Sequence, residues 1–168
     1  MPLIRPSAKA KKIQFATINI NDSTQEVGLT ATTTISSVDT TNTIIFTRTI
    51  KAGSSNSPYG AIGVQLTNST TITASYKSRG GGTQIATVLI TVVEFYPGLI
   101  NSIQYVPGSP NPATISSVNM SKTAVISLCV LGYLNQGDQG ATLTSATSVT
   151  VPASYYAAEY RWAIVEFK

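Results

Sequence analysis

The feature that most constrains this chain of 168 residues is an internal repeat. Residues 34–39 and 114–119 are identical at five of six positions, and the sixth is an exchange of Asp for Asn. Three further matches occur in the same order in both copies, one before this segment, 13–15 with 103–105, and two after it, 66–73 with 143–150 and 92–95 with 164–167. Ordered matches that end in the same Val-Glu-Phe indicate a duplicated unit rather than a shared composition.

The residues of the repeat favour strands over helices. Charged residues make up only 11% of the chain, whereas Thr, which is β-branched, recurs throughout. No long segment has apolar residues at the spacing of an amphipathic helix. Apolar and β-branched runs such as 43–50 and 84–95 are separated by turns rich in Gly, Pro and Asn. We therefore expect an all-β protein, an antiparallel β-sandwich of about eight strands built from two tandem homologous repeats.

The repeat also sets the expected organisation of the chain. Residues 1–12 are interpreted as a basic, flexible N-terminal arm, residues 13–96 as the first β repeat, and residues 97–168 as the second. Pro97 and Gly98 break the chain between the copies. A four-stranded unit cannot easily bury both of its faces, so the two repeats are expected to pack as one compact body.

The excess positive charge lies in the N-terminal arm. From residue 13 onward, seven basic residues balance seven acidic ones, so the body is expected to be neutral. The basic residues of the arm are Arg5, Lys9, Lys11 and Lys12, and its apolar residues include Leu3 and Ile4. The arm is either a solvated terminus, a docking segment for an acidic protein surface, or a contact to nucleic acid. Contact with nucleic acid is the least favoured of these three interpretations, because four charges allow only modest contact with phosphates.

The sequence offers little for catalysis or metal binding. It contains no histidine, which excludes a His-based triad and the common zinc sites. Glu94 and Glu166 could form a glycosidase pair, but their equivalent repeat positions favour a structural role, such as accepting backbone amides or pairing with Arg161. Cys129 lies in an apolar run and is expected to be a small buried residue. We predict no catalytic residue, cofactor or metal, and a protein that is not an enzyme.

Aromatic residues are the remaining candidates for a recognition surface. Four of them cluster near the C-terminus: Tyr155, Tyr156, Tyr160 and Trp162. Aromatic rings near loops can stack on sugars or anchor a protein interface. Packing in the core or at its rim is the alternative interpretation of this cluster.

The sequence also carries expectations about location. No run approaches the roughly 18 apolar residues of a membrane span, and the N-terminus lacks the apolar region of a signal peptide. We expect synthesis in a host cytoplasm and no association with a membrane.

The repeated motifs together resemble a unit common in tailed-bacteriophage structural proteins. The resemblance rests on Thr-Ile-Ser-Ser-Val at 34–38 and 114–118 and on Val-Glu-Phe at 93–95 and 165–167, and it covers nearly all of residues 13–167. It implies a virion protein, on the capsid exterior or in a tail or fibre, and carries no catalytic residues.

The leading hypothesis is a capsid decoration or cement protein, docked on the particle exterior partly through its arm. The alternative is a tail-fibre or receptor-binding, lectin-like module that contacts a host glycan. A small-virus jelly-roll coat protein comes third, because the duplication and the weakly charged arm argue against it. The expected partners are other virion proteins and further copies of the chain, in a dimer or trimer, with no nucleic acid or membrane.

Overall fold

The computed structural model describes residues 10–22, 29–52, 60–78, 84–131, 140–151 and 161–168. In these segments the chain forms strands, turns and two short 3-10 helices, and all strand pairings are antiparallel. The prediction of an all-β protein with antiparallel sheets is therefore confirmed. The described part contains thirteen strands in four sheets, more than the number expected from the sequence.

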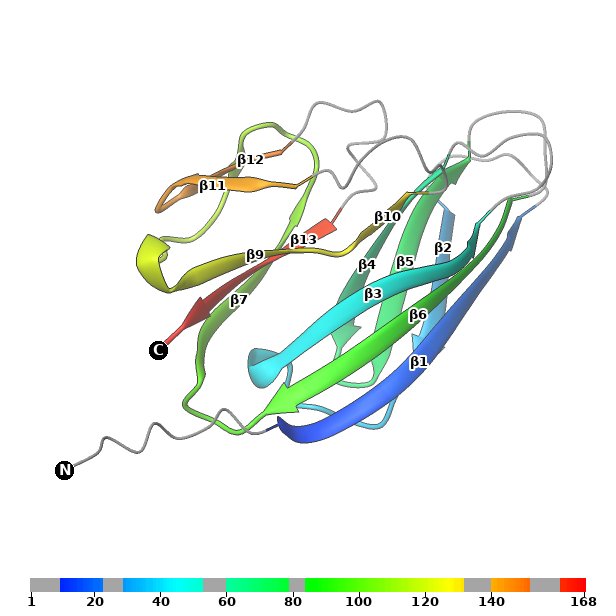
Figure 1. Ribbon diagram of the computed structural model, residues 1–168, viewed down its shortest axis with the longest axis horizontal. Helices are drawn as coiled ribbons and strands as arrows, with labels where there is room; N and C mark the ends of the chain where they lie inside the picture. Colours follow the sequence, from blue (N-terminus) through cyan, green and yellow to red (C-terminus); the bar gives the residue numbers. More distant parts are fainter. Residues whose placement is uncertain (1–9, 23–28, 53–59, 79–83, 132–139, 152–160) are drawn as a thin grey trace.

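The first half of the chain, here termed module 1, forms two facing sheets (Figure 1). One contains β1 (Ala10–Asp22), β6 (Gln84–Phe95) and β3 (Thr43–Ala52), in that order. The other contains β4 (Gly60–Asn68), β5 (Thr71–Ser78) and β2 (Leu29–Thr34). A 3-10 helix, η1 (Thr40–Asn42), leads into β3.

The second half, module 2, pairs its strands in the same order. One sheet contains β7 (Ile100–Pro107), β13 (Arg161–Phe167) and β9 (Thr123–Ser127). The other contains β11 (Thr142–Ser145), β12 (Ser148–Thr150) and β8 (Ala113–Thr114). The 3-10 helix η2 (Met120–Lys122) leads into β9. In each module the last strand is therefore central in one sheet, flanked by the first strand and by the strand that follows the 3-10 helix.

Strand alternation builds the core of module 1. Apolar residues at every second position of β1, β6, β4 and β5 point between the two sheets, because successive side chains in a strand face opposite sides. The largest fully buried residues of this core include Ile18, Ile90, Val64 and Ile72.

The sheet β7-β13-β9 is apolar on both faces and lies between the two cores. Trp162 and Ile164 of β13 belong to the core cluster of module 2. Ala163 and Val165, which point the other way, belong to the cluster of module 1. A strand buried on both faces reads as a continuous apolar run, as the sequence of β13 does.

A second link between the modules is a strand that leaves one sheet and joins another. After β9 the chain continues as β10 (Cys129–Leu131), which pairs with the edge strand β4 rather than with β13. Leu128 at the change of direction is fully buried. Its carbonyl accepts from the Val64 amide at 3.0 Å, and its amide donates to the Arg161 carbonyl at 2.9 Å. Module 2 thereby extends a sheet of module 1 (Figure 1).

Candidate functional site

The repeated hexapeptide makes the same backbone connections in both modules. In module 1 the amides of Ile35 and Val38 each donate at 2.9 Å, to the carbonyls of Thr70 and Ser69 in the turn between β4 and β5. Both side chains are buried in the core. The corresponding bonds in module 2 run from Ile115 to Thr147 at 3.0 Å and from Val118 to Ala146 at 2.9 Å. The hexapeptide therefore closes one end of each module.

The repeated Ile-Gln pair contributes a second shared connection. The Gln14 amide group donates to the Ser36 carbonyl and accepts from the Ser36 amide, both at 2.9 Å. Gln104 does the same with Ser116, at 3.1 and 2.7 Å. Each glutamine side chain thus continues a strand ladder where the backbone no longer pairs.

Glu94 forms part of this closed end in module 1. Its side chain is almost completely buried, and its Oε1 accepts from the Lys11 ammonium at 2.6 Å and from the Asp39 amide at 3.4 Å. The hydrogen bond and the attraction of Glu94 raise the pKa of Lys11 above its usual value. Glu94 therefore has the structural role predicted for it, with a lysine as its cationic partner.

Glu166 has the equivalent position in module 2, with amides in place of the lysine. It accepts from the Asn119 amide at 2.7 Å, from the Asn101 side-chain amide, and from the Ser102 hydroxyl at 3.4 Å. The bond from the Asn119 backbone, followed by that from the Asn101 side chain, lowers the pKa of the Glu166 carboxyl. Its neighbours stabilise the charged form of this carboxylate.

Asp39 and Asn119 cap the 3-10 helices that follow them. The Asp39 carboxylate accepts from the Thr41 amide at 2.9 Å, from the Thr41 hydroxyl at 2.7 Å and from the Asn42 side chain at 2.8 Å. These bonds, those from the Thr41 and Asn42 side chains above all, lower the pKa of Asp39. The Asn119 side chain accepts from the Ser121 amide and hydroxyl in the same way. The Asp/Asn exchange in the repeat therefore preserves a cap.

The acids that the sequence offered for chemistry are thus engaged in the fold. Glu94 and Glu166 lie in different modules, each within its own network of hydrogen bonds. Within the described segments, His, Cys, Asp and Glu do not gather in groups of three or more that could hold a metal ion. Cys129 is half-buried, and its sulfur lies 3.1 Å from the carbonyl oxygen and 3.2 Å from the amide nitrogen of Arg161.

Of the aromatic cluster predicted near the C-terminus, the member that the structure describes is not exposed at the surface. Trp162, a candidate for surface recognition, is fully buried, so that assignment is wrong. It lies on β13, and strand alternation directs its ring into the core of module 2. The other candidates, Tyr155, Tyr156 and Tyr160, lie outside the described residues.

The arm is shorter than the sequence indicated. β1 begins at Ala10, so Lys11 and Lys12 belong to the folded body. Lys11 pairs with Glu94, and the Lys12 ammonium donates to the Ser37 carbonyl at 3.1 Å. Assigning residues 10–12 to the arm was therefore wrong, because they lie in β1 and the side chains of Lys11 and Lys12 bind groups brought near by the fold. The remaining docking candidates, Leu3, Ile4, Arg5 and Lys9, lie outside the described residues.

The outer side of the sheet β1-β6-β3 exposes large apolar side chains. Ile13 is 55% exposed, Phe15 81%, Phe46 43% and Leu89 37%. They lie in adjacent rows across the sheet, since Phe15 and Phe46 both pair with Thr91 and Ile13 pairs with Val93, the next residue of β6 on the same side. We term Ile13, Phe15, Phe46 and Leu89 the apolar outer face. Contiguous exposed apolar groups of this kind mark protein interaction sites.

Sequence reasoning missed this face, although β1 carries a signal for it. In a strand with one buried side, apolar residues occupy positions of one parity. In β1 they occupy odd positions at Ile13 and Phe15 and even positions at Ile18 and Ile20, and the ladder to β6 has no bulge between them. Apolar residues of both parities in a strand without a bulge place some of them on the outside.

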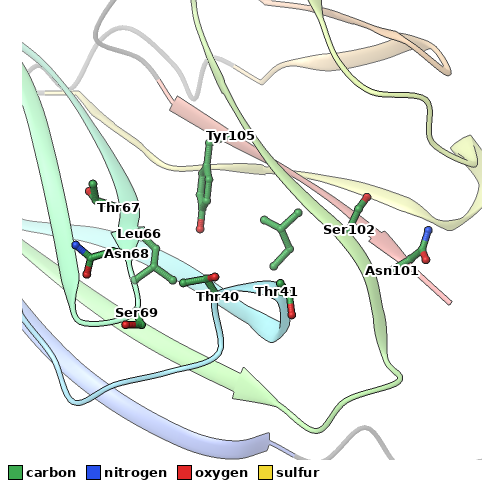
Figure 2. A pocket seen from close by; sticks show the side chains of 10 residues that line it. Thr40, Thr41, Leu66, Thr67, Asn68, Ser69, Asn101, Ser102 and Tyr105 are labelled. Carbon is green, nitrogen blue, oxygen red and sulfur yellow. The ribbon is translucent and has the colours of Figure 1, made fainter.

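A cleft of about 630 Å³ lies where the two modules meet. Its walls are formed by η1, the turn between β4 and β5, and β7, and they are rich in hydroxyl and amide groups. The lining residues are Thr40, Thr41, Leu66, Thr67, Asn68, Ser69, Asn101, Ser102, Ile103 and Tyr105. Figure 2 shows the Tyr105 ring reaching from β7 toward Leu66 and Thr40. Burial raises the pKa of the Tyr105 hydroxyl to about 12.

Comparisons of the chain with protein-family models, with curated proteins and with solved structures found no match. In the described part of the chain, no helix has the length and apolar character needed to cross a membrane.

Proposed function

We propose that this chain is a non-enzymatic structural protein of a tailed-bacteriophage particle, and that it decorates or cements the exterior of the capsid. The apolar outer face of the sheet β1-β6-β3 is the observation that carries the proposal. An aromatic side chain that is 81% exposed, flanked by further apolar groups, is costly in water and gains from a protein neighbour. A face of this kind suits a protein that works within an assembly.

The polar groups of the chain support the same proposal. The acidic side chains that catalysis would use, Glu94 and Glu166, bind backbone amides and neighbouring side chains of the fold. A corresponding network is built in each module, with Lys11 as a partner in one and Asn101 in the other, and we propose that it gives each module a rigid end. Rigidity combined with an apolar contact face is the property a cement protein needs.

The N-terminal arm adds a second contact in this proposal. With Lys11 and Lys12 assigned to the body, residues 1–9 retain Arg5 and Lys9 as basic groups and Leu3 and Ile4 as apolar ones. We propose that they dock on an acidic patch of the capsid shell. The loss of two charges from the arm makes its apolar residues more important than the sequence alone indicated.

Sedimentation with particles that lack this chain tests the proposal. The wild-type protein should bind and sediment with them. The double variant Phe15→Ser/Phe46→Ser should bind about tenfold less tightly or worse, because buried aromatic anchors dominate interfaces. Deletion of residues 1–9 should weaken binding, and raised salt should reproduce part of that loss.

Tyr96→Ser is the matched control for these variants. It removes an aromatic side chain that is 56% exposed and lies beyond the end of β6, outside the apolar outer face. It should bind as the wild type does. Wild-type protein that does not sediment with the particles would contradict the proposed function, and full binding by the double variant would contradict the role of the face.

The cleft between the modules favours a second candidate function, a receptor-binding module of a tail fibre. Hydroxyl and amide groups around one aromatic ring match the chemistry of a sugar. Screening the protein against a glycan array, with Asn68→Ala as the variant, tests this alternative. Binding that Asn68→Ala abolishes would favour host recognition, and an array without signal would leave the decoration role.

A further inference from the structure

The contact between the modules shows what the outer face of the sheet β7-β13-β9, the counterpart in module 2 of the apolar outer face, packs against. On the sheet β7-β13-β9 of module 2, Ile103, Tyr105 and Ile126 pack against the core cluster of module 1. Ala163 and Val165, on the same side of the sheet, are completely buried. The outer face of module 2 is therefore an interface within the chain.

The corresponding residues of module 1 are exposed. Ile13 and Phe15 of β1 match Ile103 and Tyr105 of β7 in the repeated sequence. Phe46, the fourth residue of β3, matches Ile126, the fourth residue of β9. The strand pairings place each residue in the same row of its sheet, since Phe15 and Phe46 flank Thr91 of β6 just as Tyr105 and Ile126 flank Ala163 of β13. Module 1 thus presents the contacting side of the same interface. Among the described residues, Ile13, Phe15 and Phe46 remain exposed there, whereas Ile44 on the same side is buried.

The surface of module 1 that accepts the outer face of module 2 is here termed the receiving side of the interface. It lies on η1 and the end of β4. Thr40 and Leu66 of module 1 line the same cleft as Ile103 and Tyr105 of module 2. Leu66 is buried, at 6% exposure. The Leu66 side chain belongs to the core of module 1, so β7 meets η1 and the end of β4 at the edge of that core.

The receiving side has its own counterpart in module 2. Met120 follows Asn119 as Thr40 follows Asp39, and Leu143 matches Leu66 in the repeat. Met120 is 46% exposed, and Leu143 is half-buried and packs against the core of module 2. Among the described residues, module 2 therefore presents a receiving surface that exposes the thioether side chain of Met120, which can adapt to an incoming aromatic ring.

We propose that the chain assembles head to tail. The apolar outer face of module 1 in one copy packs on the surface around Met120 and Leu143 in module 2 of another copy, repeating between chains the contact made within each chain. This inference rests on the proposed function, because it names a second copy as the protein neighbour of the same face. An interface between two different surfaces generates rings or open arrays, which suits a protein that covers a repeating shell.

One part of the internal contact has no counterpart between chains. In module 2 the chain leaves the sheet after Ser127, and β10 pairs with β4. In module 1, β3 stays paired with β6 as far as Ala52. Contact between copies is therefore made by faces without an added strand, and the association should be weaker than the internal contact and depend on concentration.

Two variants that disable opposite sides test the proposal by sedimentation velocity and light scattering over a range of concentrations. Phe15→Ser/Phe46→Ser removes the contacting side, and Met120→Glu places a charge on the receiving side. The wild type should rise above the monomer mass of 17.7 kDa as concentration increases, while each variant alone remains a monomer. An equimolar mixture of the two variants should form a heterodimer, because one intact pair of surfaces remains.

Several results would overturn head-to-tail assembly. The first is a wild type that is monomeric at all concentrations, and the second is a mixture of the two variants that stays monomeric. The third is a Met120→Glu protein that still dimerises, because this would indicate that two like faces pack together. Circular dichroism confirms the fold of each variant, and Tyr96→Ser should associate as the wild type does. Monomeric wild-type protein that binds particles through Phe15 would overturn this inference alone, whereas failure to bind particles at all would also overturn the proposed function.

Discussion

At the residue scale, burial follows strand parity more closely than residue type. Trp162 and Phe15 are both large aromatic residues in strands, yet the first is fully buried and the second is 81% exposed. Composition could not distinguish them, because the side of the sheet that each one faces depends on the register with neighbouring strands. The sequence therefore assigned surface recognition to Trp162, which is buried, and missed the exposed face that contains Phe15.

Trp162 gives a direct test of this difference. Trp162→Ala should lower the free energy of unfolding by about 3–5 kcal/mol, because it leaves a large cavity in the core of module 2. Phe15→Ala should change it by no more than about 0.5 kcal/mol, as expected for an exposed side chain. Urea titration of both variants makes the comparison. Since Trp162 is the only tryptophan, its emission in the wild type should be blue-shifted and should move to the red on unfolding.

Glu166 predicts a dependence of stability on acid pH. Its neighbours lower the pKa of the folded carboxyl, so the unfolded state binds more protons as pH falls. The stabilisation is fully present above the unfolded pKa and is lost as pH falls through the folded pKa. Glu166→Gln should lower the urea midpoint at neutral pH and flatten its decline between pH 5 and pH 3. An unchanged decline in the variant would show that other carboxyl groups control it.

At the element scale, the repeated motifs make the same connections in both modules. Ile35, Val38 and Gln14 have the same hydrogen-bonding roles as their counterparts in module 2. The strands and the matched segments could be predicted from the sequence, because identical residues in the two copies adopt the same backbone geometry. It could not predict that β10 leaves its sheet to join β4, because that depends on an edge supplied by the other module.

The glutamine ladders provide a matched pair of tests. Gln14→Ala and Gln104→Ala each remove two hydrogen bonds to a backbone serine, and each should lower the free energy of unfolding by about 1–2 kcal/mol. Thr17→Ala, an exposed change on β1, serves as the control and should have almost no effect. A large loss at one glutamine and none at the other would contradict equivalent roles in the two modules.

At the scale of the whole molecule, the shared middle sheet joins the two cores. Because β13 supplies Trp162 and Ile164 to one core and Ala163 and Val165 to the other, neither core can be lost without affecting the other. The sequence indicated two repeats packed as one body, but the sharing of one sheet follows from the apolar run of β13 only once its neighbours are known.

Leu128 tests this coupling. It is fully buried where β9 gives way to β10, and Leu128→Ala should cost about 2–5 kcal/mol. Both the wild type and the variant should unfold in a single calorimetric transition, with the variant's at lower temperature. Two separate transitions in the wild type would show that the modules are independent.

The central claim, that this chain is a structural protein of a particle exterior, is tested most directly by its abundance in purified particles. Quantitative mass spectrometry of particles from a culture that produces the chain measures its ratio to the major shell subunit. The decoration role predicts a fixed, near-stoichiometric ratio that falls sharply for Phe15→Ser/Phe46→Ser. Absence of the wild-type chain from the particles would contradict the account. A ratio of only a few copies per particle would indicate that the chain belongs to the tail or fibre and not to the shell.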